Sequence, residues 1–305
     1  MNKLKRRALF RQNVPLIFMS LPAFVFLVMF SYVPMFGLVL AFKDYTYRDG
    51  IFGSPWVGFD NFKYIFSSGE ITRTIGNTVL YHIAETVFML LVSLTLAILL
   101  YFVRSPRKAK IYQKNIIIPY LVSYVIISYI VNIFLSSEYG LVNKFLESIG
   151  KTPVSWYTKP AVWPFILIGV TIWFGAGIKS IYYYGSLMAI DDSLLEAADL
   201  DGASRWVKIK DIMIPSIAPT ICIFLILDLG KLLESNFALF YSVPMDSAAL
   251  YKVTDVLSTY TYRGLMNADI GTTTALGLFT GLVTTIATLL VNMVVKKFDP
   301  KSSLL

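Results

Sequence analysis

Ionisable and hydroxyl-bearing side chains interrupt a long apolar run over residues 216–242. In one continuous helix, Asp228, Lys231 and Ser235 would share a face at spacings of three and seven residues. Glu234 would lie beside them. Because a charge facing lipid costs on the order of 2.5 to 3.5 kcal/mol, this face should contact protein or water. It could hydrogen-bond the hydroxyls of a solute, or it could form salt bridges within the helix or to another subunit, and both interpretations stay open.

A second apolar run, residues 74–102, contains His82 and Glu85, which are also three residues apart. Both side chains are costly in a membrane unless they face a partner or water. We favour a structural pairing of the two. The alternative is a proton relay that also uses Asp228 and Glu234, which would be typical of an ion-coupled secondary transporter.

The sequence lacks the residue sets that most enzymes need. The single His82 excludes a histidine-rich metal site, and the lone Cys222 excludes a disulfide framework or a cysteine metal cluster. No G-x-x-x-x-G-K-S/T loop is present to bind nucleotide phosphates, and no nucleophile–base–orienter set is evident. We therefore predict a non-enzyme without a metal or cofactor in this chain.

Composition indicates an integral membrane protein. Of the 305 residues, 56% are hydrophobic and 15% are charged, and the mean hydropathy is +0.65, well above the range of soluble domains. A net charge of +8 could indicate nucleic-acid binding in a soluble chain. Here the basic residues cluster in particular loops between apolar runs, so we expect membrane lipid, and not nucleic acid, as the surrounding partner.

Apolar runs of membrane-spanning length predict an all-α membrane protein with six transmembrane helices. We divide the chain into an N-terminal part, residues 1–72, with one span and a structured outer loop, and a core domain, residues 73–305, with the other five spans. The predicted spans are residues 14–42, 74–102, 115–137, 161–190, 216–242 and 270–295.

The distribution of lysine and arginine predicts the orientation. Sixteen of these residues lie in the two tails and in the loops on the N-terminal side, and nine lie on the opposite side. By the positive-inside rule, both termini and the polar segment 193–215 are cytoplasmic. Lys179, near the cytoplasmic end of its span, is expected to extend its ammonium group towards water.

The segment 193–215 is itself patterned as two helices joined by a turn. Ser193 and Glu196 are spaced as a capping box at a helix start. Gly202 supplies the backbone freedom for a sharp turn with positive φ. Trp206, Ile209 and Met213 then follow at helical spacing on one predicted apolar face, and Pro215 is expected to end this helix.

The same segment resembles the EAA signature of ABC importer permeases. Glu196-Ala197-Ala198, then Gly202, Ile212 and Pro215, keep the spacing of that pattern, and Ile214 stands where the pattern has leucine. The resemblance implies a coupling helix that docks in a cleft on a cytoplasmic ATPase; the alternative is an ordinary cytoplasmic connector. The implied coupling residues are Glu196, Ala197, Ala198, Asp201, Gly202, Trp206, Ile212 and Pro215.

A further resemblance lies in the outer loop that follows the first span. FKDY at 42–45 and PWVGFDNFKYIF at 55–66 closely resemble segments of maltose-type carbohydrate permeases. Physical chemistry alone would also make these aromatic side chains a belt at the membrane interface, and the two interpretations are compatible. The belt would consist of Trp56, Phe59, Phe62, Tyr64 and Phe66.

These resemblances imply the type I ABC importer fold and a place near the permeases for polysaccharides or complex oligosaccharides in Gram-positive bacteria. The implied assembly is a heterodimer with a second permease subunit in the cell membrane. Two cytoplasmic ATPase subunits, which bind ATP and Mg, and an extracellular solute-binding lipoprotein complete it. The cargo would be a carbohydrate imported by alternating access; an importer for a peptide or another non-sugar solute is the alternative.

Overall fold

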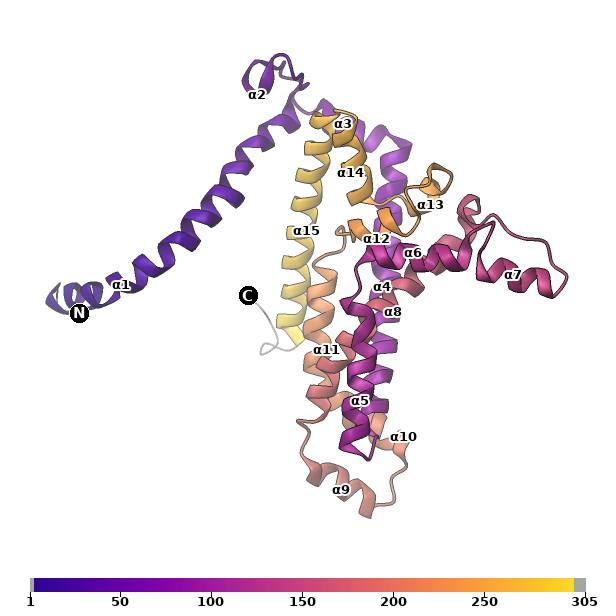
Figure 1. Cartoon of the computed structure of the whole chain (residues 1–305). Helices are drawn as coiled ribbons and strands as arrows, with labels where there is room; N and C mark the ends of the chain where they lie inside the picture. The colour runs from indigo at the N-terminus through magenta and orange to yellow at the C-terminus, as the bar shows by residue number, and fades with distance from the viewer. Residues whose placement is uncertain (1–2, 299–305) are drawn as a thin grey trace. The chain divides into compact units, whose positions relative to one another are not determined.

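The computed structural model describes residues 3–298, which are predominantly helical (Figure 1). The only β-pairing among these residues is an isolated antiparallel bridge between Lys43 and Trp56. Two compact units can be distinguished. In the described part, the first unit comprises residues 3–65 and 264–278, and the second comprises residues 66–263 and 279–298.

The first unit begins with a long helical segment. Helix α1 (Lys3–Leu27) continues into a π turn (Val28–Tyr32) and a 3₁₀ helix (Val33–Phe42). Its stretch Phe18–Phe42 is long and apolar enough to cross a membrane, which confirms the first predicted span. The helical geometry changes beside Pro34, which has no N–H to donate to the preceding turn.

The loop after this segment is held by the residues that carry the carbohydrate-permease resemblance. The Lys43 ammonium donates to the carbonyl oxygens of Ile51 and Phe52 at 2.8 and 2.9 Å. The Asn61 amide donates to the carbonyl oxygens of Ala41 and Lys43 at 2.9 and 3.0 Å. The loop is thus structured, as predicted. The spacing of its two motifs allows the Asn61 side chain of the second motif to bond the backbone at the first. The short helices of this loop are α2 (Gly50–Gly53) and α3 (Asp60–Ser67).

The second unit is built around long helices. Helix α4 (Gly69–Tyr101) and helix α8 (Trp163–Leu187) form its most extensive helix pair. Both are long and apolar enough to span a membrane, as is α15 (Ile270–Phe298), which begins within the first unit. These three helices confirm the spans predicted over residues 74–102, 161–190 and 270–295.

The third predicted span, residues 115–137, is not one straight helix. Helix α5 (Pro106–Ile117) and a 3₁₀ turn (Ile118–Leu121) are followed by α6 (Tyr124–Leu135), with a bend of 94° between them. Pro119 lies in the first turn of the 3₁₀ segment, where its ring and missing N–H prevent continuation of the α-helix. The described residues therefore contain five candidate spans, or six if this bent pair counts as one.

The prediction for the fifth span, residues 216–242, is wrong at both ends. The continuous helix runs from Arg205 to Leu229 and ends at Gly230, and residues 230–236 form a turn. A new helix, α12 (Phe237–Ser242), starts after Asn236, whose side chain accepts a hydrogen bond from the Leu239 N–H at 3.1 Å. A short polar side chain that caps a new helix explains the break.

Residues 243–263, predicted as part of an outer loop, contribute to the core of the second unit. Val243, Leu250 and Val256 are fully buried and pack in one apolar cluster with Trp163 and Leu167 of α8. The elements that complete the described chain are α7 (Leu141–Ser148), α13 (Tyr251–Thr254), α14 (Leu257–Met266), and 3₁₀ turns at Trp156–Thr158, Pro160–Val162 and Ala248–Leu250.

An ionic cluster holds residues 246–263 together. The Arg263 guanidinium donates to the carboxylates of Asp246, at 3.1 Å, and Asp255, and it lies 4.0 Å from the ring centroid of Tyr251. Burial lowers the pKa of Arg263, but hydrogen bonding to Asp255 and the charges of Asp255 and Asp246 outweigh it, and the pKa is raised. The cluster therefore fixes a segment that sequence analysis predicted as a loop.

Candidate functional site

The segment with the EAA resemblance forms a helix, a turn and a second helix. Helix α9 (Asp192–Leu200) starts after Asp191, whose carboxylate accepts a hydrogen bond from the Ser193 N–H at 3.0 Å. The predicted capping box is therefore wrong: Ser193 is already helical, and Asp191 is the cap. The hydrogen bond from the Ser193 backbone N–H lowers the pKa of Asp191, and a hydrogen bond from the Ser193 side chain adds to this effect.

The turn after α9 has the geometry that sequence analysis predicted. Gly202 adopts φ +73°, a left-handed conformation that glycine reaches without the cost of a side chain. Its N–H donates to the Asp199 carbonyl oxygen at 3.1 Å, and the Ala203 N–H donates to the Ala198 carbonyl oxygen at 2.9 Å. A Cβ atom added at Gly202 would meet no other atom within 4 Å. Glycine is required here by the backbone, not by crowding.

The second helix does not end at Pro215. Helix α10 (Arg205–Val207) passes through a π turn (Lys208–Met213) directly into α11 (Ile214–Leu229), so coupling segment and span are one helix. Pro215 has no N–H to donate to the preceding turn, and it lies just after the π turn, where the α-helical hydrogen-bond pattern is already altered. The Lys208 ammonium also forms an ion pair with the Asp199 carboxylate, which joins α9 to this helix.

The apolar residues of the segment face two ways. Met213 is fully buried, and Ile209 packs with it against the core. Trp206 is 69% exposed, so the single apolar face predicted for these three residues is wrong. The π turn between them changes the helical register, which explains the difference.

Helix α9 lies beyond the end of α8 (Figure 1), and most residues of the segment are exposed. Leu200 is 90% exposed and Leu194 is 52% exposed, and Trp206 is exposed as well. Several large apolar side chains exposed on one polar segment are typical of a protein-binding surface. Of the other predicted coupling residues, Glu196, Ala197, Asp201, Gly202 and Pro215 are exposed, and Ala198 and Ile212 are half-buried.

The four residues predicted as a solute path do not share a helical face. Asp228 lies at the end of α11, and its carboxylate forms an ion pair with the Lys179 ammonium of α8. Lys179 thus does not extend to water as predicted, because α11 brings a carboxylate to its level. Lys231 and Glu234 follow in the turn, exposed and 3.8 Å apart. The Ser235 hydroxyl donates to the Ser258 hydroxyl at 2.8 Å.

A polar cavity of about 140 Å³ lies between α4, α8 and α11. The Thr171 hydroxyl donates to the Glu85 carboxylate at 3.1 Å, and His82 Nε2 lies 2.7 Å from the Asp228 carbonyl oxygen. His82 and Glu85 therefore bind different partners. Sequence analysis did not predict Thr171 or the role of Lys179 at this cavity. A lysine within an apolar run was nevertheless a signal, because such a charge needs a carboxylate partner or a polar cavity. The cavity is lined by His82, Glu85, Thr86, Met89, Thr171, Lys179 and Asp228.

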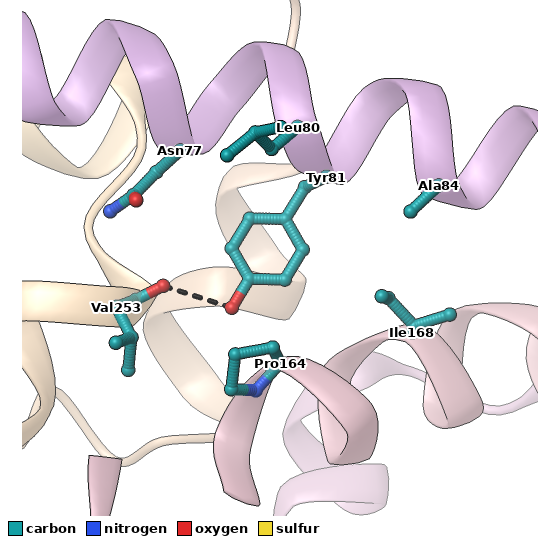
Figure 2. A pocket seen from close by; sticks show the side chains of 7 residues that line it. All are labelled: Asn77, Leu80, Tyr81, Ala84, Pro164, Ile168 and Val253. Carbon is teal, nitrogen blue, oxygen red and sulfur yellow. Dashed lines mark hydrogen bonds between the residues drawn. The ribbon is translucent and has the colours of Figure 1, made fainter. Parts of the chain in front are cut away.

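A larger cavity of about 310 Å³ is apolar (Figure 2). Tyr81 points across it from α4, and its hydroxyl donates to the Val253 carbonyl oxygen at 2.9 Å. The Asn77 amide donates to the Asp255 carbonyl oxygen at 2.9 Å. The Tyr81 hydroxyl and the Asn77 amide thus already donate to backbone carbonyl oxygens. The smaller cavity, which is lined by ionisable and hydroxyl side chains, is better suited to a hydroxyl-rich solute. Among residues 3–298, no group of three or more His, Cys, Asp or Glu side chains could hold a metal ion.

Comparison with known proteins gives consistent matches. The family model described as "Binding-protein-dependent transport system inner membrane component" matches residues 93–303. The polygalacturonan/rhamnogalacturonan transport system permease protein YteP of Bacillus subtilis (strain 168) is 33% identical over 288 residues, which cover 94% of this chain and 89% of that protein.

Two crystal structures are also similar. One is of a bacterial ABC transporter involved in the import of the acidic polysaccharide alginate; its matching chain has a TM-score of 0.88 and 33% identity, with coverage of 98% of this chain and 100% of that chain. The other is of a bacterial alginate ABC transporter in complex with an alginate pentasaccharide-bound periplasmic protein. There the TM-score is 0.85 and the identity 34%, with coverage of 94% and 96%.

Proposed function

The chain belongs to the family of binding-protein-dependent transport system inner membrane components, and from this premise we propose that it is the permease subunit of an ATP-driven importer of complex oligosaccharides. The observation that carries the proposal is the exposed α9 segment with its left-handed turn at Gly202, whose residues keep the spacing of the EAA signature. The similarity to an alginate importer along nearly the whole chain supports the cargo class.

The energy for import comes from a partner. We assign the exposed side chains of Leu194, Leu200 and Trp206 to contact with a cytoplasmic ATPase, of which two copies bind and hydrolyse ATP with Mg. The charge distribution supports this placement, because the more basic loops lie on the side of α9 and of both termini. Lys301 of the C-terminal tail contributes to that count but lies outside the described residues.

The cargo is a carbohydrate rich in hydroxyl groups. In the polar cavity, Glu85 can accept hydrogen bonds from sugar hydroxyls and Thr171 helps to position its carboxylate. Lys231, Glu234 and Ser235 lie in the turn beyond α11, and we retain them as candidates for the sugar path, whereas the carboxylate of Asp228 is paired with Lys179. YteP is a polygalacturonan/rhamnogalacturonan transport system permease protein, which supports oligosaccharides derived from polysaccharides as the substrate class.

The permease works with other subunits. A second permease subunit completes the path, and an extracellular solute-binding lipoprotein delivers the sugar to the cell membrane of a Gram-positive bacterium. The structure of an alginate transporter with its periplasmic protein bound supports the delivery step, and the Bacillus origin of YteP supports the host class. When the ATPases close on ATP, the coupling segments approach each other and the paired permeases open outwards.

The test is purification of the affinity-tagged chain from its native membrane, followed by reconstitution in lipid nanodiscs. We expect a second permease and an ATPase to copurify. The rate of ATP hydrolysis should rise when the solute-binding protein is added together with an oligogalacturonide or another oligosaccharide that it binds. A chain that purifies alone, or hydrolysis that is unaffected by every oligosaccharide bound by that protein, would contradict the proposal.

A further inference from the structure

The two helices that flank the coupling segment form one packed antiparallel pair. Near α9, the hydroxyls of Ser186 in α8 and Thr220 in α11 lie 3.0 Å apart. One turn further along, the rings of Tyr183 and Phe224 meet edge to face at 5.5 Å. Leu187 of α8 is fully buried in the apolar cluster of this contact. Side chains therefore join α8 and α11 over several turns, with α9 at the end of the pair.

The Lys179–Asp228 ion pair closes the opposite end of this contact. The two side chains are only 17% and 28% exposed, and the Lys179 ammonium also lies 5.8 Å from the ring centroid of Phe224. In such a partly dehydrated site, removal of one charge leaves the other without compensation. The pair thus favours one relative position of α8 and α11 over others.

Helix α11 is fixed from two further helices at the same level. Because a carbonyl oxygen can only accept, His82 Nε2 of α4 carries the hydrogen in its contact with the Asp228 carbonyl. The Thr288 hydroxyl of α15 donates to the Gly230 carbonyl oxygen at 3.1 Å. Lys179, Asp228 and His82 also line the polar cavity beside Glu85. The wall of the cavity and the end of the helix pair are therefore made of the same residues.

We propose that Lys179 and Asp228 are positioning residues that make α8 and α11 move as one arm, so that a change at the polar cavity is transmitted to α9. This inference rests on the proposed function. It assigns Asp228 to the connection between helices, whereas Glu85 faces the cavity without a cation partner among the described residues. Neutralising one member of the pair should loosen the contact of α11 with α8 at the polar cavity and weaken the coupling of ATP hydrolysis to sugar delivery.

The experiment measures ATP hydrolysis by the full complex in nanodiscs, with and without the solute-binding protein and an oligosaccharide that it binds. In Lys179→Met and in Asp228→Asn, the stimulation by sugar should fall about tenfold, within the range of typical coupling free energies. Lys63→Met, which removes one member of an ion pair whose side chains are 77% and 65% exposed, is the matched control and should keep the full stimulation.

The double variant Lys179→Met, Asp228→Leu decides between positioning and direct sugar contact. It removes both charges and keeps apolar contact between the helices, a replacement that buried ion pairs often tolerate. We expect it to assemble and to regain most of the stimulation. Loss of assembly or of stimulation in the double variant, or full stimulation in both single variants, would overturn the inference. Failure of the unchanged complex to respond to sugar would instead contradict the proposed function.

Discussion

Replacement of Gly202 by valine tests the coupling segment at one backbone position. Gly202 has φ +73°, and a Cβ atom there would meet no neighbour within 4 Å. The cost of a side chain is therefore the backbone strain alone, about 1–2 kcal/mol for an ordinary L-residue in the left-handed region. That free energy corresponds to roughly a 5- to 30-fold loss in the population of the native turn.

The assay compares sugar-stimulated ATP hydrolysis in Gly202→Val and Gly202→Asn at equal amounts of membrane-inserted protein. Asparagine tolerates the left-handed conformation far better than a β-branched residue, and the Cβ atom that both side chains share meets no atom within 4 Å, so the pair compares backbone strain. We expect coupling to fall severalfold or more in Gly202→Val and to change little in Gly202→Asn. Equal coupling in the two variants would refute the reasoning.

Further substitutions test the packing, the ionic cluster and the helix cap. In α8, a Cβ atom at Gly177 would collide with the Ile116 carbonyl oxygen, whereas one at Gly169 meets nothing within 4 Å; Gly177→Ala should therefore lower the yield of assembled complex on size-exclusion chromatography, and Gly169→Ala should not. Asp255→Asn removes a fully buried carboxylate from Arg263 and should destabilise the complex by about 3 kcal/mol, measured as a lower Tm. Because the pKa of Asp191 is lowered in the folded state, its capping contribution is present above the unfolded pKa of about 3.9 and is lost only as the pH falls through the folded value. Coupling should thus not change through Asp191 between about pH 6 and 8, where the carboxylate stays ionised; Asp191→Ala should weaken coupling, and Asp191→Asn, which keeps an acceptor oxygen, should preserve it.

The sequence predicts best where one physical signal dominates. The spans over residues 74–102, 161–190 and 270–295 were predicted because membrane-length apolar runs have few structural alternatives. The left-handed turn at Gly202 was predicted because glycine stands between two helical patterns. The family assignment also favours a binding-protein-dependent importer over the ion-coupled secondary transporter that His82, Glu85, Asp228 and Glu234 had left open.

Hydropathy was a poor guide to where helices break. The apolar stretch that begins at Phe237 packs against protein, with Leu239 and Phe240 buried, and its hydropathy extended the predicted fifth span falsely. Pro119 breaks the third span although its neighbours are apolar. A single residue marks each break, Pro119 in the third span and the helix cap Asn236 in the fifth, and hydropathy averaged over a membrane-length window does not register either.

Pairings between distant segments were the other gap. The Lys179–Asp228 ion pair joins residues 49 positions apart, and the sequence offered nearer partners for both. The contact exists because α9 and its turn reverse the chain, so that α8 and α11 lie antiparallel at a particular register. The packing of Ile209 and Met213, away from Trp206, likewise depends on a π turn that no spacing rule indicated.

Site-specific crosslinking at Leu200 tests the central claim, that α9 docks on a cytoplasmic ATPase. In a Cys222→Ser background, which removes the single native cysteine, Leu200→Cys places a thiol at a residue that is 90% exposed. Phe52→Cys, at a residue of the outer loop that is 93% exposed, is the matched control. With a thiol-reactive photo-crosslinker, we predict a covalent product with the ATPase subunit from position 200 and none from position 52. A covalent product with the ATPase from position 52, or no such product from position 200 in an assembled complex, would contradict the account.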